Sequence, residues 1–429
     1  MNYLPYFSME TWTLLVTVFT LIAVYAYWPY GTFKRIGVPG PKPIPFFGTM
    51  LNYKRGFTTF DQECFNKYGK TWGIYDGRQP VLCTTDISMI KTVLVKECYS
   101  VFTNRRNFRL NGPLYDAVSI AEDDHWKRIR SVLSPSFTSG RLKEMFDLMK
   151  QHSANLVSSM QKKADKNEVL ELKEFFGPYS MDVVTSTAFS VDIDSLNNPS
   201  DPFVVNIKKM LKFDFFDPVF LLIAFFPFMA PIFEKMEYSF FPAYVTDFFY
   251  TSLKKIKASR LASKQEERSR TSSSSLSFLA YNLALNPGPM TKLQQEIDSA
   301  FPNQRVAKAT VEINGLVIPK DAVFMVPLWP LHRDPEFWPN PEEFQPERFN
   351  KENKERIEPY TYMPFGMGPR NCIGMRFAVV MMKLAMVEIL QRFSFVVCDE
   401  TEVPLEMDVQ GLLMPKRPIR VKLEPRSDH

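Results

Sequence analysis

The stretch PFGMGPRNCIGMRF, residues 364–377, places one cysteine between glycine-rich turns and the start of a helix. Gly366 and Gly368 allow tight turns that expose backbone N–H groups. We expect a helix over 375–393, which puts Cys372 at its amino end. There the helix dipole and the unpaired N–H groups stabilise an anion, so the position favours a thiolate.

A protected thiolate serves either as a nucleophile or as a metal ligand. A nucleophile needs a neighbouring base, and the four histidines of the chain are scattered, with no two at ligand spacing. The same scarcity argues against a zinc or non-haem iron site. One thiolate in a rigid loop, with Arg370 nearby and a long apolar helix behind it, is how haem iron is held from one side. Asn371 occupies the third glycine position of GxGxxG, which argues against a dinucleotide loop.

The composition indicates a large apolar core. The chain has 429 residues, of which 45% are hydrophobic and 14% aromatic, and a net charge of +5. Such a mild charge suits a membrane surface or an acidic protein partner and gives no support for nucleic acid binding. Five cysteines without a CxxC pair indicate reduced thiols rather than disulfides.

The run TWTLLVTVFTLIAVYAYW, residues 11–28, carries no charge. As a helix it would be about 27 Å long, enough to cross the hydrocarbon core of a membrane. A signal peptide would have basic residues before the run and a cleavage site after it, and neither is present. A buried core helix is the remaining alternative to an anchor. Lys34 and Arg35 follow the run, which by the positive-inside tendency leaves the rest of the chain cytoplasmic.

We therefore divide the chain into three parts: an amino-terminal tail and anchor helix over 1–28, a stiff proline-rich hinge over 29–48, and one large domain over 49–429.

Helical periodicity is clearest at 139–164 and 374–393, whereas short β-like runs occur at 70–85 and 310–328. The second β-like run has a hairpin turn at Asn314–Gly315. The expected fold class is mainly α with a small β region.

The cysteine loop resembles the haem-binding signature of the cytochrome P-450 family, FxxGxRxCxG, at every fixed position. Residues 332–349, which end in PERF, and WKRIR at 126–130 resemble two further motifs of that family. The anchor and the hinge are similar to those of its microsomal members. The segments at 93–106 and 119–145 resemble the drug-metabolising 3A subfamily of vertebrates, and the resemblance covers essentially the whole chain.

The resemblance implies a role for several residues. Cys372 would be the thiolate ligand of the iron of haem b, with Phe365 packed beside the sulfur. The haem propionates would be neutralised by Trp126, Arg130, Arg105 and Arg370. Candidate substrate contacts are Phe108, Ser119, Phe213, Phe215 and Phe220, although a stretch as rich in phenylalanine as 213–228 also suits core or membrane-dipping helices.

The function that the resemblance implies is haem-thiolate monooxygenation of lipophilic substrates such as steroids and xenobiotics. O₂ would be the oxidant. Electrons from NADPH would arrive through a separate cytochrome reductase, with cytochrome b5 as a candidate assisting partner. The expected location is the endoplasmic reticulum membrane, with a single anchor and a cytoplasmic catalytic domain.

Two parts of the family pattern are missing. In the oxygen-activating helix, Thr271 falls at the position of the family's threonine, but Arg270 stands where an acid is required for proton delivery. The helix that carries ExxR is absent as well, and Glu267 with Arg270 spells that motif at the wrong place in the chain order. The fold is therefore expected to be incomplete. The alternative reading is a truncated splice, gene-model or pseudogene-like relative that is haem-poor or catalytically inactive.

Overall fold

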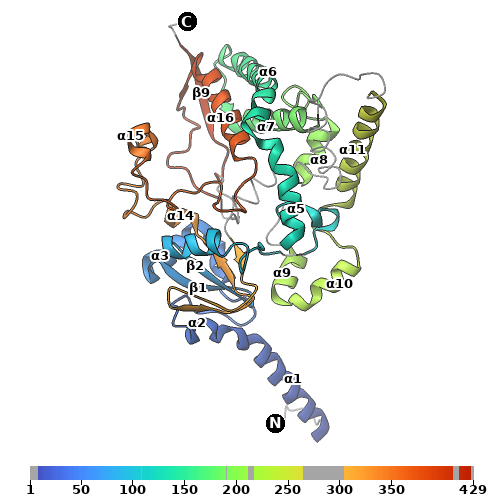
Figure 1. Cartoon of the computed structure of the whole chain (residues 1–429), viewed down its shortest axis with the longest axis vertical. Coiled ribbons are helices and arrows are strands. Elements are labelled where there is room, and N and C mark those ends of the chain that lie inside the picture. Colours follow the sequence, from blue (N-terminus) through green and yellow to red (C-terminus); the bar gives the residue numbers. More distant parts are fainter. Residues whose placement is uncertain are drawn as a thin grey trace, which may run out of the picture. The chain divides into compact units, whose positions relative to one another are not determined.

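The computed structural model describes residues 8–107, 109–189, 191–210, 217–263, 304–408 and 415–426. The chain divides into two compact units, which are described separately. Unit 1 consists of Met1–Arg106, Phe216–Met229 and Asn303–Met363; unit 2 consists of Asn107–Phe215, Ala230–Pro302 and Pro364–His429. The architecture is mainly helical with small sheets, as the sequence predicts (Figure 1).

Unit 1 is built on a four-stranded sheet in the order β1-β2-β7-β4. The bounds are Thr71–Asp76 for β1, Gln79–Thr84 for β2, Val323–Met325 for β7 and Arg305–Val306 for β4. β1 and β2 are antiparallel, which confirms the predicted β-like run at 70–85, and β7 joins β2 in parallel. Helix α3, Phe57–Tyr68, contributes Phe60 and Cys64 to the core that includes Trp72 and Val81 of the sheet.

A separate hairpin in unit 1 confirms the turn predicted at Asn314–Gly315. Strands β5, Val311–Ile313, and β6, Leu316–Ile318, pair in antiparallel register around it. Asn314 and Gly315 have φ angles of 51° and 75°. Both angles lie in the left-handed region, which a two-residue hairpin turn requires and which asparagine and glycine tolerate best.

The remaining helices of unit 1 are mostly short. Helix α1 is the exception, a long apolar helix that the unit leaves almost entirely exposed (Figure 1). The bounds are Met9–Tyr27 for α1, Thr32–Arg35 for α2, Ile87–Lys91 for α4, Pro218–Phe225 for α9, Leu328–Leu331 for α14 and Lys351–Lys354 for α15.

The proline-rich segment after α1 lies against strand β1. Gly73 donates its N–H to the Pro39 carbonyl at 2.8 Å. A Cβ on Gly40 would come within 2.0 Å of the Gly73 carbonyl oxygen, and a Cβ on Gly73 would come within 2.3 Å of the Phe33 ring. A side chain at position 40 would collide with the backbone at Gly73, and one at position 73 would collide with the Phe33 ring, so both positions favour glycine.

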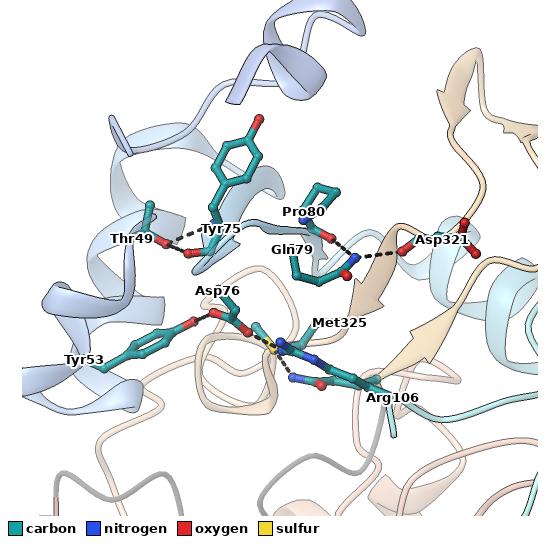
Figure 2. A network of polar contacts seen from close by, with 10 residues as sticks. Thr49, Tyr53, Tyr75, Asp76, Gln79, Pro80, Arg106, Asp321 and Met325 are labelled. Carbon is teal, nitrogen blue, oxygen red and sulfur yellow. Dashed lines mark hydrogen bonds and ion pairs between the residues drawn. The ribbon is translucent and has the colours of Figure 1, made fainter. Parts of the chain in front are cut away.

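Polar contacts gather around the turn end of the β1–β2 hairpin in unit 1 (Figure 2). Asp76 accepts a hydrogen bond from the Tyr53 hydroxyl at 2.5 Å and forms an ion pair with Arg106. Gln79 donates from Nε2 to the Asp321 carbonyl at 2.7 Å. The network therefore connects the β1–β2 hairpin with segments that are far away in the chain.

Asp61 of α3 lies close to this network without a partner of its own. Its Oδ1 atom is buried and accepts no hydrogen bond. Burial, followed by the charge of Asp76, raises the pKa of the Asp61 carboxyl to about 8. The folded protein therefore keeps this carboxyl protonated in a pH range where the unfolded chain ionises it.

We expect this carboxyl to make unit 1 less stable at alkaline pH. Its contribution to stability is fully present below the ordinary pKa of 3.8 and is lost as the pH rises through about 8. Asp61→Asn should raise the free energy of unfolding by about 1–3 kcal/mol at pH 8.5. The difference should shrink as the pH falls to 5. Urea unfolding of the full chain in detergent measures it. Glu63→Gln, an exposed change on the same helix, should show no such pH dependence, and an equal gain at both pH values would contradict the prediction.

Unit 2 is a helical assembly with a small three-stranded sheet in the order β3-β9-β8. Its helices are α5, Asp123–Leu133; α6, Ser139–Ala164; α7, Leu172–Phe189; α8, Pro202–Met210; α10, Ala230–Lys235; α11, Ala243–Ser263; and α16, Met375–Leu390. Its strands are β3, Leu170–Glu171; β8, Phe393–Val396; and β9, Arg420–Pro425.

The core of unit 2 lies where α6, α7 and α16 pack together (Figure 1). Leu142, Met145 and Met149 recur at helical spacing on α6, which explains the predicted helix at 139–164. Tyr179 of α7 donates its hydroxyl to the Met381 carbonyl of α16 at 3.0 Å. This packing fixes α16 and therefore the loop that precedes it.

Candidate functional site

The cysteine loop of unit 2 ends at α16 and buries Cys372, whose exposed fraction is 5%. Its backbone N–H donates to the Phe365 carbonyl at 2.9 Å. Gly366 and Gly368 have φ angles of 70° and 76°, in the left-handed region that glycine adopts without strain. The glycines thus close the loop on itself and hold the sulfur in one place at the amino end of α16.

Arg370, in the same loop, is 2% exposed and packs on helix α5. Its Nη2 donates to the Ala121 carbonyl at 2.8 Å, and its guanidinium lies 4.0 Å from the centre of the Trp126 ring. A guanidinium over an indole face is a favourable cation–π contact. The tryptophan predicted from the WxxxR motif is therefore next to the arginine predicted from the cysteine loop.

Arg130 makes the second connection between α5 and the loop. Its Nη1 and Nη2 donate to the backbone carbonyl and the side-chain Oδ1 of Asn371, both at 2.8 Å. Trp126 and Arg130 are four residues apart, so they lie on one face of α5. In the sequence Asn371 is notable only because it breaks a glycine pattern, and no local signal identifies it as the partner of Arg130.

This donor set fits a haem group. A single buried cysteine at a helix amino end suits a thiolate ligand of iron, and the described residues of unit 2 place two arginines beside it, which suit the two carboxylates of haem. Phe365 is half-buried in the same loop. Four residues predicted from separate motifs, Trp126, Arg130, Arg370 and Cys372, are therefore brought together in one unit.

The remaining predicted site residues are divided between the two units and the residues that the structure does not describe. Arg105 is half-buried in unit 1. Phe220 is buried on α9 of unit 1, and Ser119 is buried in unit 2. Phe108, Phe213, Phe215 and Thr271 lie outside the described residues, as do Glu267 and Arg270.

The PERF sequence forms a 3-10 helix at Pro346–Phe349 of unit 1. Arg348 donates from Nη2 to the Asn340 carbonyl at 2.8 Å, and within the described residues it forms no ion pair with a carboxylate. Phe344 beside it is 94% exposed. Because Arg348 itself reaches solvent, the lack of a carboxylate partner among the described residues costs less than the ~3–5 kcal/mol typical of a broken buried ion pair.

The chain belongs to the cytochrome P-450 family of monooxygenases. The family model described as "Cytochrome P450" matches residues 38–270 and 302–423. Among curated proteins the chain is 66% identical to "Cytochrome P450 3A40" of Oryzias latipes, over 98% of each chain. It is 65% identical to "Cytochrome P450 3A30" of Fundulus heteroclitus, over 98% of this chain and 99% of the relative. It is 48% identical to "Cytochrome P450 3A12" of Canis lupus familiaris, over 100% of this chain and 99% of the relative.

These comparisons also show a difference in length. The alignment with the Oryzias latipes relative runs over 493 positions, whereas the chain has 429 residues, so at least 64 positions of the alignment have no residue of this chain. The family match is interrupted between residues 270 and 302. The interruption falls in the part of the sequence where two segments of the family pattern are missing.

Proposed function

We propose that the chain is a haem-thiolate monooxygenase of lipophilic substrates such as steroids and xenobiotics. The observation that carries the proposal is the contact of the cysteine loop with the WxxxR face of α5, through Arg370 on Trp126 and Arg130 on Asn371. When bound, haem b would supply the activation of O₂ that no side chain offers.

Each residue of this site has a distinct task in the proposal. Cys372 holds the iron through its sulfur, and Phe365 keeps water from that sulfur. Arg370, Arg130 and Trp126 bind and orient the propionates, with Arg105 as a further cation. Candidate substrate contacts are Phe108, Phe213, Phe215 and Phe220, with Ser119, and Thr271 is the candidate alcohol for proton delivery.

The electron source and the location follow from the same proposal. Electrons come from NADPH through a separate reductase, with cytochrome b5 as an assisting partner. Residues Met9–Arg35 contain a candidate membrane span that the rest of the protein leaves almost uncovered. This favours attachment to the endoplasmic reticulum membrane through α1, with the large domain over 49–429 on the cytoplasmic side beyond the hinge at 29–48.

A second candidate function is favoured by the difference in length. A chain that lacks the acid of the oxygen-activating helix and the ExxR helix would bind little haem and turn over little substrate. The exposed Phe344 and the carbonyl contact of Arg348 are consistent with a missing neighbour in this part of unit 1. In this reading the chain is a haem-poor or inactive relative.

One experiment separates the two functions. The full chain is purified from membranes, its haem is quantified, and product formation is measured with reductase, NADPH and a panel of lipophilic substrates. We expect substoichiometric haem and weak turnover, with reducing equivalents lost to peroxide. Stoichiometric haem with efficient product formation would show that the chain is a fully competent monooxygenase and would remove the second candidate.

A further inference from the structure

The turn between strands β5 and β6 of unit 1 presents the dipeptide Asn314–Gly315 on the protein surface. Both residues are exposed, and a Cβ on Gly315 would meet no other atom within 4 Å. Among the described residues the Gly315 N–H donates no hydrogen bond. Because glycine carries no side chain, its backbone nitrogen can come close to the side-chain amide of the preceding asparagine and attack it.

The side-chain amide of Asn314 is held by the hydroxyl of Ser88 in helix α4. The Ser88 Oγ donates to Oδ1 of Asn314 at 3.4 Å and accepts from Nδ2 at 3.2 Å. A donor that points at a carbonyl oxygen stabilises the negative charge which this oxygen takes when the carbonyl carbon is attacked. Ser88 therefore stands beside both the oxygen that gains charge and the nitrogen that would leave.

We propose that Asn314 is a site of spontaneous deamidation, assisted by Ser88, whose isoaspartate product opens the β5–β6 hairpin. The Gly315 nitrogen attacks Cγ of Asn314, the bond from Cγ to Nδ2 breaks, and ammonia leaves with the proton of the Gly315 nitrogen. Water then opens the resulting five-membered imide at one of its two carbonyls. Opening at Cγ gives aspartate, and opening at the backbone carbonyl gives isoaspartate. Water replaces ammonia without a change of oxidation state, so no cofactor takes part.

The isoaspartate product lengthens the backbone of the turn by one methylene group. The antiparallel pairs Ile313–Leu316 and Val311–Ile318 are set by a turn of two residues. Ile313 is 4% exposed and Ile318 is fully buried. A lengthened turn breaks this register, so we expect the hairpin to loosen and its two isoleucines to lose their burial.

A second Asn-Gly dipeptide, Asn111–Gly112 of unit 2, provides a comparison within the same chain. Asn111 is half-buried, and its Nδ2 donates to the Asn107 Oδ1 at 3.0 Å. A Cβ on Gly112 would lie 2.7 Å from the Ser239 Oγ, so this backbone is packed against a neighbour. The two sites share their local chemistry and differ in their freedom to close the imide ring.

The test incubates the purified full chain in detergent and follows both dipeptides by mass spectrometry, with isoaspartate detected by enzymatic methylation of its carboxylate. We expect conversion at Asn314 to be severalfold faster than at Asn111. The rate should rise with pH, because the attacking nitrogen must lose its proton. In urea the two sites should convert at similar rates. Equal rates in the folded chain, or a difference that persists unchanged in urea, would overturn the assignment.

Two variants test the role of Ser88 and the effect on the hairpin. Ser88→Ala should slow conversion at Asn314 by about two- to fivefold, less than the loss of a donor costs in an enclosed oxyanion hole, because water competes at an exposed turn. Ser100→Ala, which changes an exposed serine bonded to Glu97, is the matched control and should leave the rate unchanged. An unchanged or faster rate in Ser88→Ala would refute the assistance.

Trypsin cleavage after Lys320, an exposed residue just beyond β6, reports the opening of the hairpin. In the parent chain this cleavage should accelerate as isoaspartate accumulates. In Asn314→Gln, whose longer side chain closes the ring far more slowly, it should stay constant over the same incubation. Cleavage that does not change while isoaspartate accumulates in the parent would show that the hairpin stays closed.

Discussion

Replacing Cys372 with serine should abolish the ferrous–CO absorption that is characteristic of sulfur-ligated haem. The sulfur is buried at the amino end of α16 in a loop closed by its own backbone hydrogen bond to Phe365. A serine hydroxyl fits the same space but is a poor, hard ligand that does not form the soft anion. The change should therefore remove the proposed iron ligand and leave the loop intact.

The matched control for this prediction is Cys398→Ser. Cys398 is a free, half-exposed cysteine of the same unit, just after strand β8. The control variant should keep whatever sulfur-ligated absorption the parent chain shows, measured as the CO difference spectrum per mole of protein. An unchanged spectrum in Cys372→Ser would place the iron ligand elsewhere.

Restoring the missing positions should raise activity more than any single substitution. The proposed variant replaces residues 264–303, which include the interruption of the family match, with the corresponding segment of the Oryzias latipes relative. A placed acid and alcohol contribute about 10²–10⁴-fold to a proton-transfer step. We therefore expect product formation per chain to rise by about 10²-fold or more, with haem content approaching one per chain.

A linker of glycine and serine with the same length as the restored segment provides the control. It adds chain length without adding proton donors or an apolar helix face, so haem content and product formation should remain at the level of the parent. If both the restored chain and the linker chain stay inactive, the defect lies in a part of the site that the sequence comparison does not distinguish from its relatives.

The elements that the sequence predicts well are those set by local chemistry. The helix at 139–164 has a mostly apolar stripe at helical spacing, and Asn314–Gly315 has a backbone preference that selects one kind of turn. The helix expected over 375–393 ends earlier, at Leu390, because Phe393 enters strand β8 and pairs with Pro425. A pairing partner that lies more than thirty residues away leaves no trace in the local periodicity.

In the candidate site, too, the local sequence predicts single residues, whereas their contacts depend on tertiary packing. Motif spacing predicts Cys372, Trp126 and Arg130 individually, and four-residue spacing places the last two on one face of α5. The guanidinium of Arg370 over the Trp126 ring and the bonds of Arg130 to Asn371 depend on how α5 docks against the loop. That docking is a tertiary arrangement, so no pattern within either segment predicts it.

The close approach of Gly40 to Gly73 has a consequence for how this gene varies in populations. A methyl group at either position would meet backbone or the Phe33 ring at 2.0–2.3 Å, and no exchange at the other position can make room for it. Under selection for a folded product, these two codons should therefore be free of amino-acid replacements, whatever happens in the region around Thr271. In a decaying copy they would drift at the same rate as the codons for exposed residues such as Glu63. Allele surveys of these two glycine codons would thus distinguish a maintained gene from a relic without any protein being made.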